Sequence, residues 1–253
     1  LAAAAGDAAD TQAQLEAWRA RDEEYSNLTS AGSLDRHKRH SRFLLCAAGL
    51  RDLLHDWPAI ARLGRDALDE IETALREDPE DGELLYFRSL ARGLIGLALM
   101  REGKTAEAGA VLPEVLGVVR GDPPMPFTGW NDILWWAYHP VSEACVDWLA
   151  QNGAVTQARS QLEKDLGARA AQGGEDPGLN YYKRGMIAEG QLRLVELLDP
   201  TKPADAALRI KLLDHVASVL SSSEAEGRVT VYYREAKAKL EALRTVAATA
   251  SGR

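Results

Sequence analysis

The sequence carries the same pattern of apolar residues and glycine twice, fifty residues apart. In each copy a run spaced for a helix stops at a glycine, Gly103 or Gly153, and an alanine five residues later, Ala108 or Ala158, begins a second such run. This is the pattern of a helical hairpin. Because one hairpin cannot bury its apolar face alone, we expect such hairpins to stack into an array, and arrays of this kind usually hold a partner.

The composition favours an all-α fold. Alanine, leucine, arginine and glutamate, which are strong helix formers, dominate the 253 residues, and no β-branched run alternates as a strand would. Glycine- and proline-containing clusters at 121–126 and 173–177 separate pairs of expected helices. Those pairs cover 83–102 with 105–120, 129–151 with 154–171, and 178–198 with 203–221.

Further helices are expected on either side of these pairs. The spacing predicts helices over 11–27 and 35–56, and a third begins at Pro58 and closes at Asp78-Pro79. A last helix is expected over 224–247, with Ser223 and Glu226 as its capping box. We therefore expect one repeat domain over 11–248 with about four to five hairpins. Residues 1–10 are expected to be flexible and 249–253 frayed.

The 84–120 segment resembles one unit of the tetratricopeptide repeat family. That family places a small residue at the packing point of its first helix, a glycine near the turn and an alanine early in its second helix. The matching residues here are Gly96, Leu99, Gly103, Ala108, Leu112 and Leu116. The resemblance extends more weakly over about 40–220, with a spacing nearer fifty than thirty-four residues. It implies a right-handed superhelical array of antiparallel hairpins, an α-solenoid.

By the same resemblance, the first helix of each hairpin lines a concave groove. In the 84–120 unit this groove side includes Leu97 and Met100, and in the next unit Glu143 and Asp147. One part of the groove is thus expected to be apolar and the next acidic. Such a surface suits a helix or peptide that has an apolar patch beside basic residues.

A second candidate binding surface is the aromatic loop at 123–139. It carries Trp130, Asn131, Trp135 and Tyr138 beside a proline-rich stretch, and rigid aromatic side chains of this kind are typical of interaction hot spots. The alternative is that these rings fill the space created by a long connection between repeats. His139 is expected to be a capping or surface histidine.

The only dense basic cluster is at 36–42, with Arg36, Lys38, Arg39 and Arg42. It is either a solvated helix face that pairs with acidic neighbours or a docking patch for an acidic partner. His37 and His40 fall on one helical face, but no third ligand stands nearby, so no metal site is predicted.

Composition and missing motifs narrow the function. A net charge of −8 argues against nucleic-acid binding, and no apolar run reaches the roughly 20 residues of a membrane span. The sequence contains no phosphate-binding glycine loop, no zinc-protease motif and no nucleophile elbow, so we expect neither an enzyme nor a cofactor. Cys46 and Cys145 lie among apolar neighbours and are expected to be buried free thiols.

The sequence therefore predicts a non-enzymatic interaction or scaffold domain. Its expected partner is a protein or peptide, bound on the concave face or the aromatic loop, with the chain as a subunit of a larger assembly. One alternative is the small-molecule or peptide-sensing domain of an exported or membrane-tethered regulator. Another is a helical enzyme with two converging carboxylates. The start Leu-Ala-Ala-Ala-Ala-Gly-Asp fits either a fragment or a mature exported or organelle-targeted chain from which a leader was removed.

Overall fold

The structure, a computed structural model, describes residues 8–28, 33–119, 134–171, 177–227 and 229–251. Helices account for nearly all of these residues and none of them lies in a strand, which confirms the all-α class. The contacts between residues divide the chain into two units, Asp7–Asn152 and Gly153–Arg253, which we call the N-terminal and the C-terminal unit. In the described part of the chain, no helix is long and apolar enough to cross a membrane.

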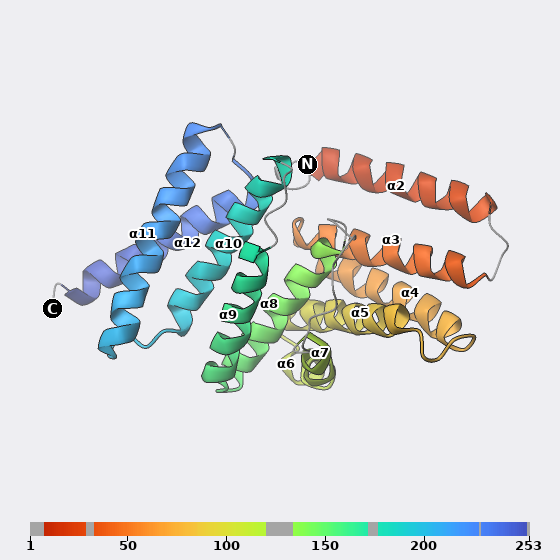
Figure 1. The fold of residues 1–253 in the computed structure, drawn as a ribbon, viewed down its shortest axis with the longest axis horizontal. Helices are drawn as coiled ribbons and strands as arrows, with labels where there is room; N and C mark the ends of the chain where they lie inside the picture. The colour runs from red at the N-terminus through yellow and green to blue at the C-terminus, as the bar shows by residue number, and fades with distance from the viewer. Residues whose placement is uncertain (1–7, 29–32, 120–133, 172–176, 228, 252–253) are drawn as a thin grey trace. The chain divides into compact units, whose positions relative to one another are not determined.

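The N-terminal unit is built on four long helices. The helices α3 (Leu34–Asp52), α4 (Trp57–Leu75) and α5 (Gly82–Arg101) pack one against the next, and α8 (Trp135–Gln151) lies against both α5 and α3 (Figure 1). The core side chains, among them Leu45, Ile60, Ile71, Phe87 and Leu90, are almost completely buried. The helix α2 (Ala8–Leu28) packs on α3.

Two short helices follow α5, where the sequence predicted one helix over 105–120. The first, α6 (Thr105–Ala108), ends at a turn, and α7 begins afterwards (Leu112–Val119). Gly109 lies at the C-cap of α6, and Pro113 lacks the N–H group that a continuous helix would need at that position. The expectation of one continuous helix there is wrong.

The glycine turns are where the sequence predicted them. Gly103 and Gly153 have φ values of +75° and +76°, in the left-handed region that favours glycine. After α5, the amide of Lys104 donates to the carbonyl of Leu99 at 2.8 Å and that of Gly103 to the carbonyl of Met100 at 3.1 Å. These two bonds form a Schellman motif, which satisfies carbonyl groups that the helix end would otherwise leave open.

The C-terminal unit contains four helices in its described residues, and α10 lies among the others. The helix α10 (Pro177–Leu197) packs against α9 (Val155–Ala171), α11 (Pro203–Ala225) and α12 (Val231–Ser251) (Figure 1). One apolar cluster joins α10, α11 and α12. It comprises Ala188, Leu192, Val216, Leu220, Tyr233, Ala236 and Leu240. This cluster fixes the distance between α10 and α11.

The beginning of the last helix differs from the sequence prediction. Ser223 lies inside α11, where its hydroxyl donates to the carbonyl of Val219 at 3.0 Å, so the capping box expected at Ser223 and Glu226 is wrong. The helix α11 ends before Gly227, whose φ is +70°. Thr230 caps α12 instead, since its Oγ1 accepts from the amide of Tyr233 at 3.1 Å.

Both cysteines are free and buried, as the sequence predicted. Cys46 on α3 and Cys145 on α8 are each fully inaccessible to solvent. Burial raises the pKa of the Cys46 thiol far above its usual value, because an apolar surrounding disfavours the thiolate. Cys46 therefore acts as a small apolar core residue rather than as a nucleophile.

A partly buried ion pair ties α3 to the start of α5. Asp81 is the N-cap of α5, where it accepts from the amides of Glu83 and Leu84 at 3.0 Å, and it also pairs with Lys38. Burial raises the pKa of Asp81, but the hydrogen bonds from Lys38 and the backbone outweigh it, so the net pKa is lowered. Burial also lowers the pKa of Lys38, yet Asp81 and Glu83 raise it overall.

These opposite shifts predict how the pair contributes to stability. The Asp81 contribution is complete above a pH of about 4 and is lost as pH falls through its lowered pKa. The Lys38 contribution is complete below a pH of about 10 and is lost as pH rises through its raised pKa. We expect Lys38→Met to cost about 1 kcal/mol at neutral pH, and less at either extreme.

Urea unfolding of the wild type and of Lys38→Met across pH 3–11 measures this difference. The exposed Lys211 offers the control, since Lys211→Met should give a small difference at every pH. A Lys38→Met difference that stays constant over the whole range would contradict the role assigned to the pair.

Candidate functional site

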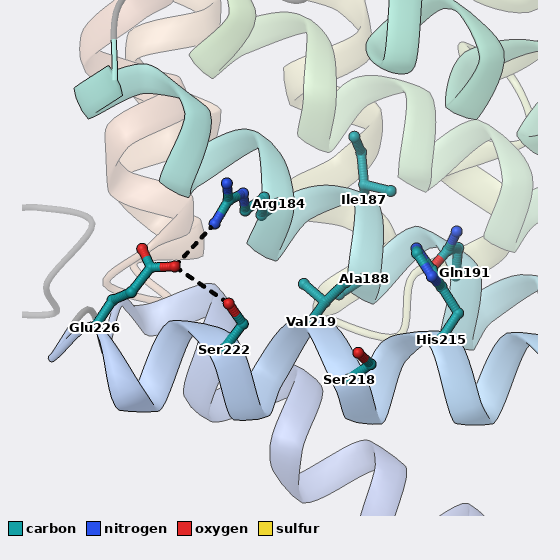
Figure 2. A pocket seen from close by; sticks show the side chains of 9 residues that line it. All are labelled: Arg184, Ile187, Ala188, Gln191, His215, Ser218, Val219, Ser222 and Glu226. Atoms are coloured by element: carbon teal, nitrogen blue, oxygen red, sulfur yellow. Dashed lines mark hydrogen bonds and ion pairs between the residues drawn. The ribbon is translucent and has the colours of Figure 1, made fainter.

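A cleft of about 440 Å³ lies between α10 and α11. The residues that line it fall at helical spacing on each wall, so one stripe of α10 faces one stripe of α11 (Figure 2). The lining residues are Arg184, Ile187, Ala188 and Gln191 from α10, His215, Ser218, Val219 and Ser222 from α11, and Glu226 at the C-cap of α11. The volume is in the range that binds small ligands or short peptide segments.

One end of the cleft carries an ion pair. The guanidinium of Arg184 lies 3.5 Å from a carboxylate oxygen of Glu226, and the hydroxyl of Ser222 donates to the same oxygen at 3.1 Å (Figure 2). Both charged side chains are more than a third exposed, so this pair contributes little to stability. The pair joins the end of α11 to α10 across the cleft. The Arg184 guanidinium and the Glu226 carboxylate thereby balance each other's charge.

The middle of the cleft is apolar, and polar groups return at the other end. Ile187, Ala188 and Val219 form the apolar part, with Ala188 almost fully buried at the base. Gln191 and His215 line the other end of the cleft (Figure 2). The Oε1 atom of Gln191 is buried and accepts no hydrogen bond from the described residues. Such an acceptor is costly to leave without a donor.

The helix pair is tied firmly at its turn. Arg209 on α11 donates to the carbonyls of Val195 and of Leu198, the latter at 3.3 Å. Asp205 accepts from the amide of Asp199 at 3.1 Å and from Arg159 at 2.9 Å, and the hydrogen bond from Arg159 lowers the pKa of Asp205. The cleft lies between the middle of α10 and the second half of α11. Its walls are therefore two anchored helices, which suits a preformed binding site.

The residues that the sequence predicted for a groove, and Tyr138 of the predicted aromatic loop, lie elsewhere, on α5 and α8. Leu97, Tyr138 and Glu143 are buried, and Met100 is half-buried. Asp147 is half-buried and lies 3.4 Å from Arg101. Leu97 is completely buried, as expected where α5 lies against α8, so it belongs to a core rather than to an open groove.

The aromatic loop falls largely outside the described residues. Trp130 and Asn131 lie in the part of the chain that is not described, and Trp135 is the residue at which α8 begins. His139 on α8 is 1 % exposed, so the expectation of a surface histidine is wrong. Its Nε2 atom lies 3.4 Å from a carboxylate oxygen of Glu143.

The basic cluster on α3 pairs with acidic residues of neighbouring helices. Besides the contact with Asp81, Lys38 lies 3.4 Å from Glu83. His37 approaches Glu70 at 2.6 Å and His40 approaches Asp22 at 2.5 Å. Arg36 and Arg42 are half-buried, whereas Arg39 is exposed. Lys38 and the two histidines thus hold α3 to α2, α4 and α5.

The comparisons with known proteins leave the cleft to be interpreted from its own chemistry. No protein-family model, curated protein or solved structure matches the chain. The sequence had not pointed to any residue of the cleft. The one available signal was that Arg184 and Gln191, and likewise His215 and Ser222, are seven residues or two helical turns apart. Polar residues at such spacing usually mark a solvated helix face.

Proposed function

We propose that this chain is a non-enzymatic, tetratricopeptide-like array of helical hairpins that binds a partner protein or peptide, and that the α10–α11 cleft is its binding site. The observation that carries the proposal is the cleft itself, which offers an apolar middle between two polar ends on anchored helices. Binding sites typically combine an apolar surface with a few polar groups that fix the orientation of the ligand.

The openness of the cleft favours a chain segment over an enclosed small molecule. Arg184, His215, Ser218, Ser222 and Glu226 all line the cleft and are all exposed. A bound segment can therefore enter at one end and continue past the other. Pockets for small molecules usually bury most of the surface of their ligand. A cleft lined by so many exposed residues would leave much of a small molecule in contact with solvent.

The test compares two serines of α11 that differ in their relation to the cleft. Ser218 and Ser221 are both exposed, but only Ser218 lines the cleft. Ser218→Trp should fill the cleft, and Ser221→Trp adds the same bulk outside it. Peptides are first selected from a displayed library of random dodecapeptides on the intact wild-type protein.

We expect enriched peptides to bind the wild type and Ser221→Trp equally, and Ser218→Trp at least tenfold more weakly, as measured by isothermal titration calorimetry. Thermal unfolding of both variants checks that the fold is intact. The proposal fails if the selection enriches no peptide, or if the two variants bind every selected peptide with the same affinity.

A further inference from the structure

The hydrogen-bonding groups of the cleft indicate what kind of segment it accepts. Arg184 and Glu226 neutralise each other, and Ser222 donates to the same carboxylate. The other polar lining residues are Gln191, His215 and Ser218. An amide and a hydroxyl can each donate and accept, and an imidazole ring offers two nitrogen atoms for hydrogen bonds. The groups that remain for a ligand can therefore both donate and accept hydrogen bonds.

This inventory does not match an anionic ligand. Phosphate and carboxylate groups only accept hydrogen bonds and are bound best by cations, above all by arginine. The one arginine of the lining is engaged with Glu226, so an anion would have to displace that carboxylate. A cationic ligand would likewise have to displace Arg184. An uncharged ligand can enter without breaking the pair.

Gln191 makes the requirement more specific. Its Oε1 atom is buried and receives no hydrogen bond within the described structure. If the amide is turned, its NH₂ group takes the same place and needs an acceptor instead. A peptide group satisfies either orientation, because it presents an N–H donor and a C=O acceptor side by side.

The apolar middle limits the side chain that accompanies this peptide group. Ile187 and Val219 are half-buried and Ala188 is almost fully buried, so the strip between the polar ends is aliphatic. Resting on the function proposed above, we infer that the cleft binds an uncharged peptide segment. One peptide group of the segment hydrogen-bonds to Gln191, and an aliphatic side chain lies against Ile187, Ala188 and Val219.

The first experiment removes the amide from the cleft. Gln191→Leu keeps a similar volume but offers no hydrogen bond, and Gln157→Leu is the matched change at an exposed position of α9. With a dodecapeptide selected on the wild type, we expect about tenfold weaker binding for Gln191→Leu. Gln157→Leu should bind as the wild type does. Equal affinities for both variants would overturn the inference.

The second experiment identifies the chemistry with defined probes. The blocked tripeptide acetyl-Gly-Val-Gly-amide, its ester analogue that lacks the valine N–H, and sodium acetate are each titrated into the ¹⁵N-labelled intact protein. We expect the tripeptide to shift the side-chain amide signals of Gln191 in NMR spectra, and the ester and acetate to do so at least tenfold more weakly. The inference is overturned if acetate binds as well as the tripeptide.

The two proposals fail in different ways. If Ser218→Trp weakens the selected peptides but Gln191→Leu does not, the cleft still binds peptides and only the role of the peptide group is wrong. If neither variant changes the affinity, the cleft is not the binding site and both proposals fail.

Discussion

Gly49→Ala is expected to destabilise the N-terminal unit by about 3 kcal/mol, because the added methyl group has no space. A Cβ atom at Gly49 on α3 would lie 1.9 Å from the carbonyl oxygen of Trp136 on α8 and 2.2 Å from the carbonyl carbon. These are backbone atoms, so no side-chain rotation can relieve the overlap. The two helices would have to move apart, and the tightly packed core side chains around them resist such a movement.

Urea unfolding followed by circular dichroism measures this effect. Gly117→Ala on α7 is the control, since a Cβ atom there would meet none of the described residues outside its own helix within 4 Å. Alanine is the better helix former, so this control should be neutral or stabilising by up to about 1 kcal/mol. Equal unfolding midpoints for the two variants would show that α3 and α8 do not approach each other as closely as described.

Leu192→Ala is expected to cost the C-terminal unit about 3 kcal/mol. Leu192 is completely buried in the apolar cluster that joins α10, α11 and α12, where Val216 and Leu220 are also members. Removing three carbon atoms loses their transfer free energy and leaves a cavity. Because the same cluster sets the spacing of the two walls, we also expect weaker binding of selected peptides.

The matched change is Ile210→Ala on α11, where the side chain is 63 % exposed. It removes a side chain of the same size from the surface and should alter the free energy of unfolding by about 0.5 kcal/mol or less. Chemical denaturation of both variants gives the comparison. A Leu192→Ala loss no larger than that of Ile210→Ala would mean that the cluster does not hold the helices together.

The sequence predicted the features of the fold that depend on local chemistry. The glycine turns at Gly103 and Gly153 follow from a backbone conformation that other residues adopt only with strain, so glycine marks them reliably. The free, buried state of the cysteines followed from their apolar neighbours. The all-α class was likewise predicted from the composition and from the spacing of the apolar residues.

Predictions failed where two signals competed within a few residues. Ser223 and Glu226 have the spacing of a capping box, but the apolar stripe of α11 continues through Leu220 and the glycine turn comes later. His139 and Glu143 have polar side chains and yet are buried on α8, which periodicity alone does not reveal. A capping pattern is a local signal, and tertiary packing decides which of several signals prevails.

The cleft could not be predicted because it depends on how two helices meet. Neither stripe is unusual by itself, since each mixes polar and aliphatic residues such as Gln191 with Ile187, or His215 with Val219. The two stripes face each other only because the turn holds α10 against α11. Similarly, the pairing of Lys38 with Asp81 joins residues far apart in the chain, so the basic cluster alone left two interpretations open.

The most direct test of the binding site is hydrogen exchange of the intact protein with and without a selected dodecapeptide, followed by mass spectrometry. If the peptide occupies the cleft, amide exchange should slow in the segments 184–191 and 215–226, and other segments of the chain should change little. Slower exchange confined to 36–42 or to 134–147, with none in α10 or α11, would contradict the assignment of the cleft as the binding site.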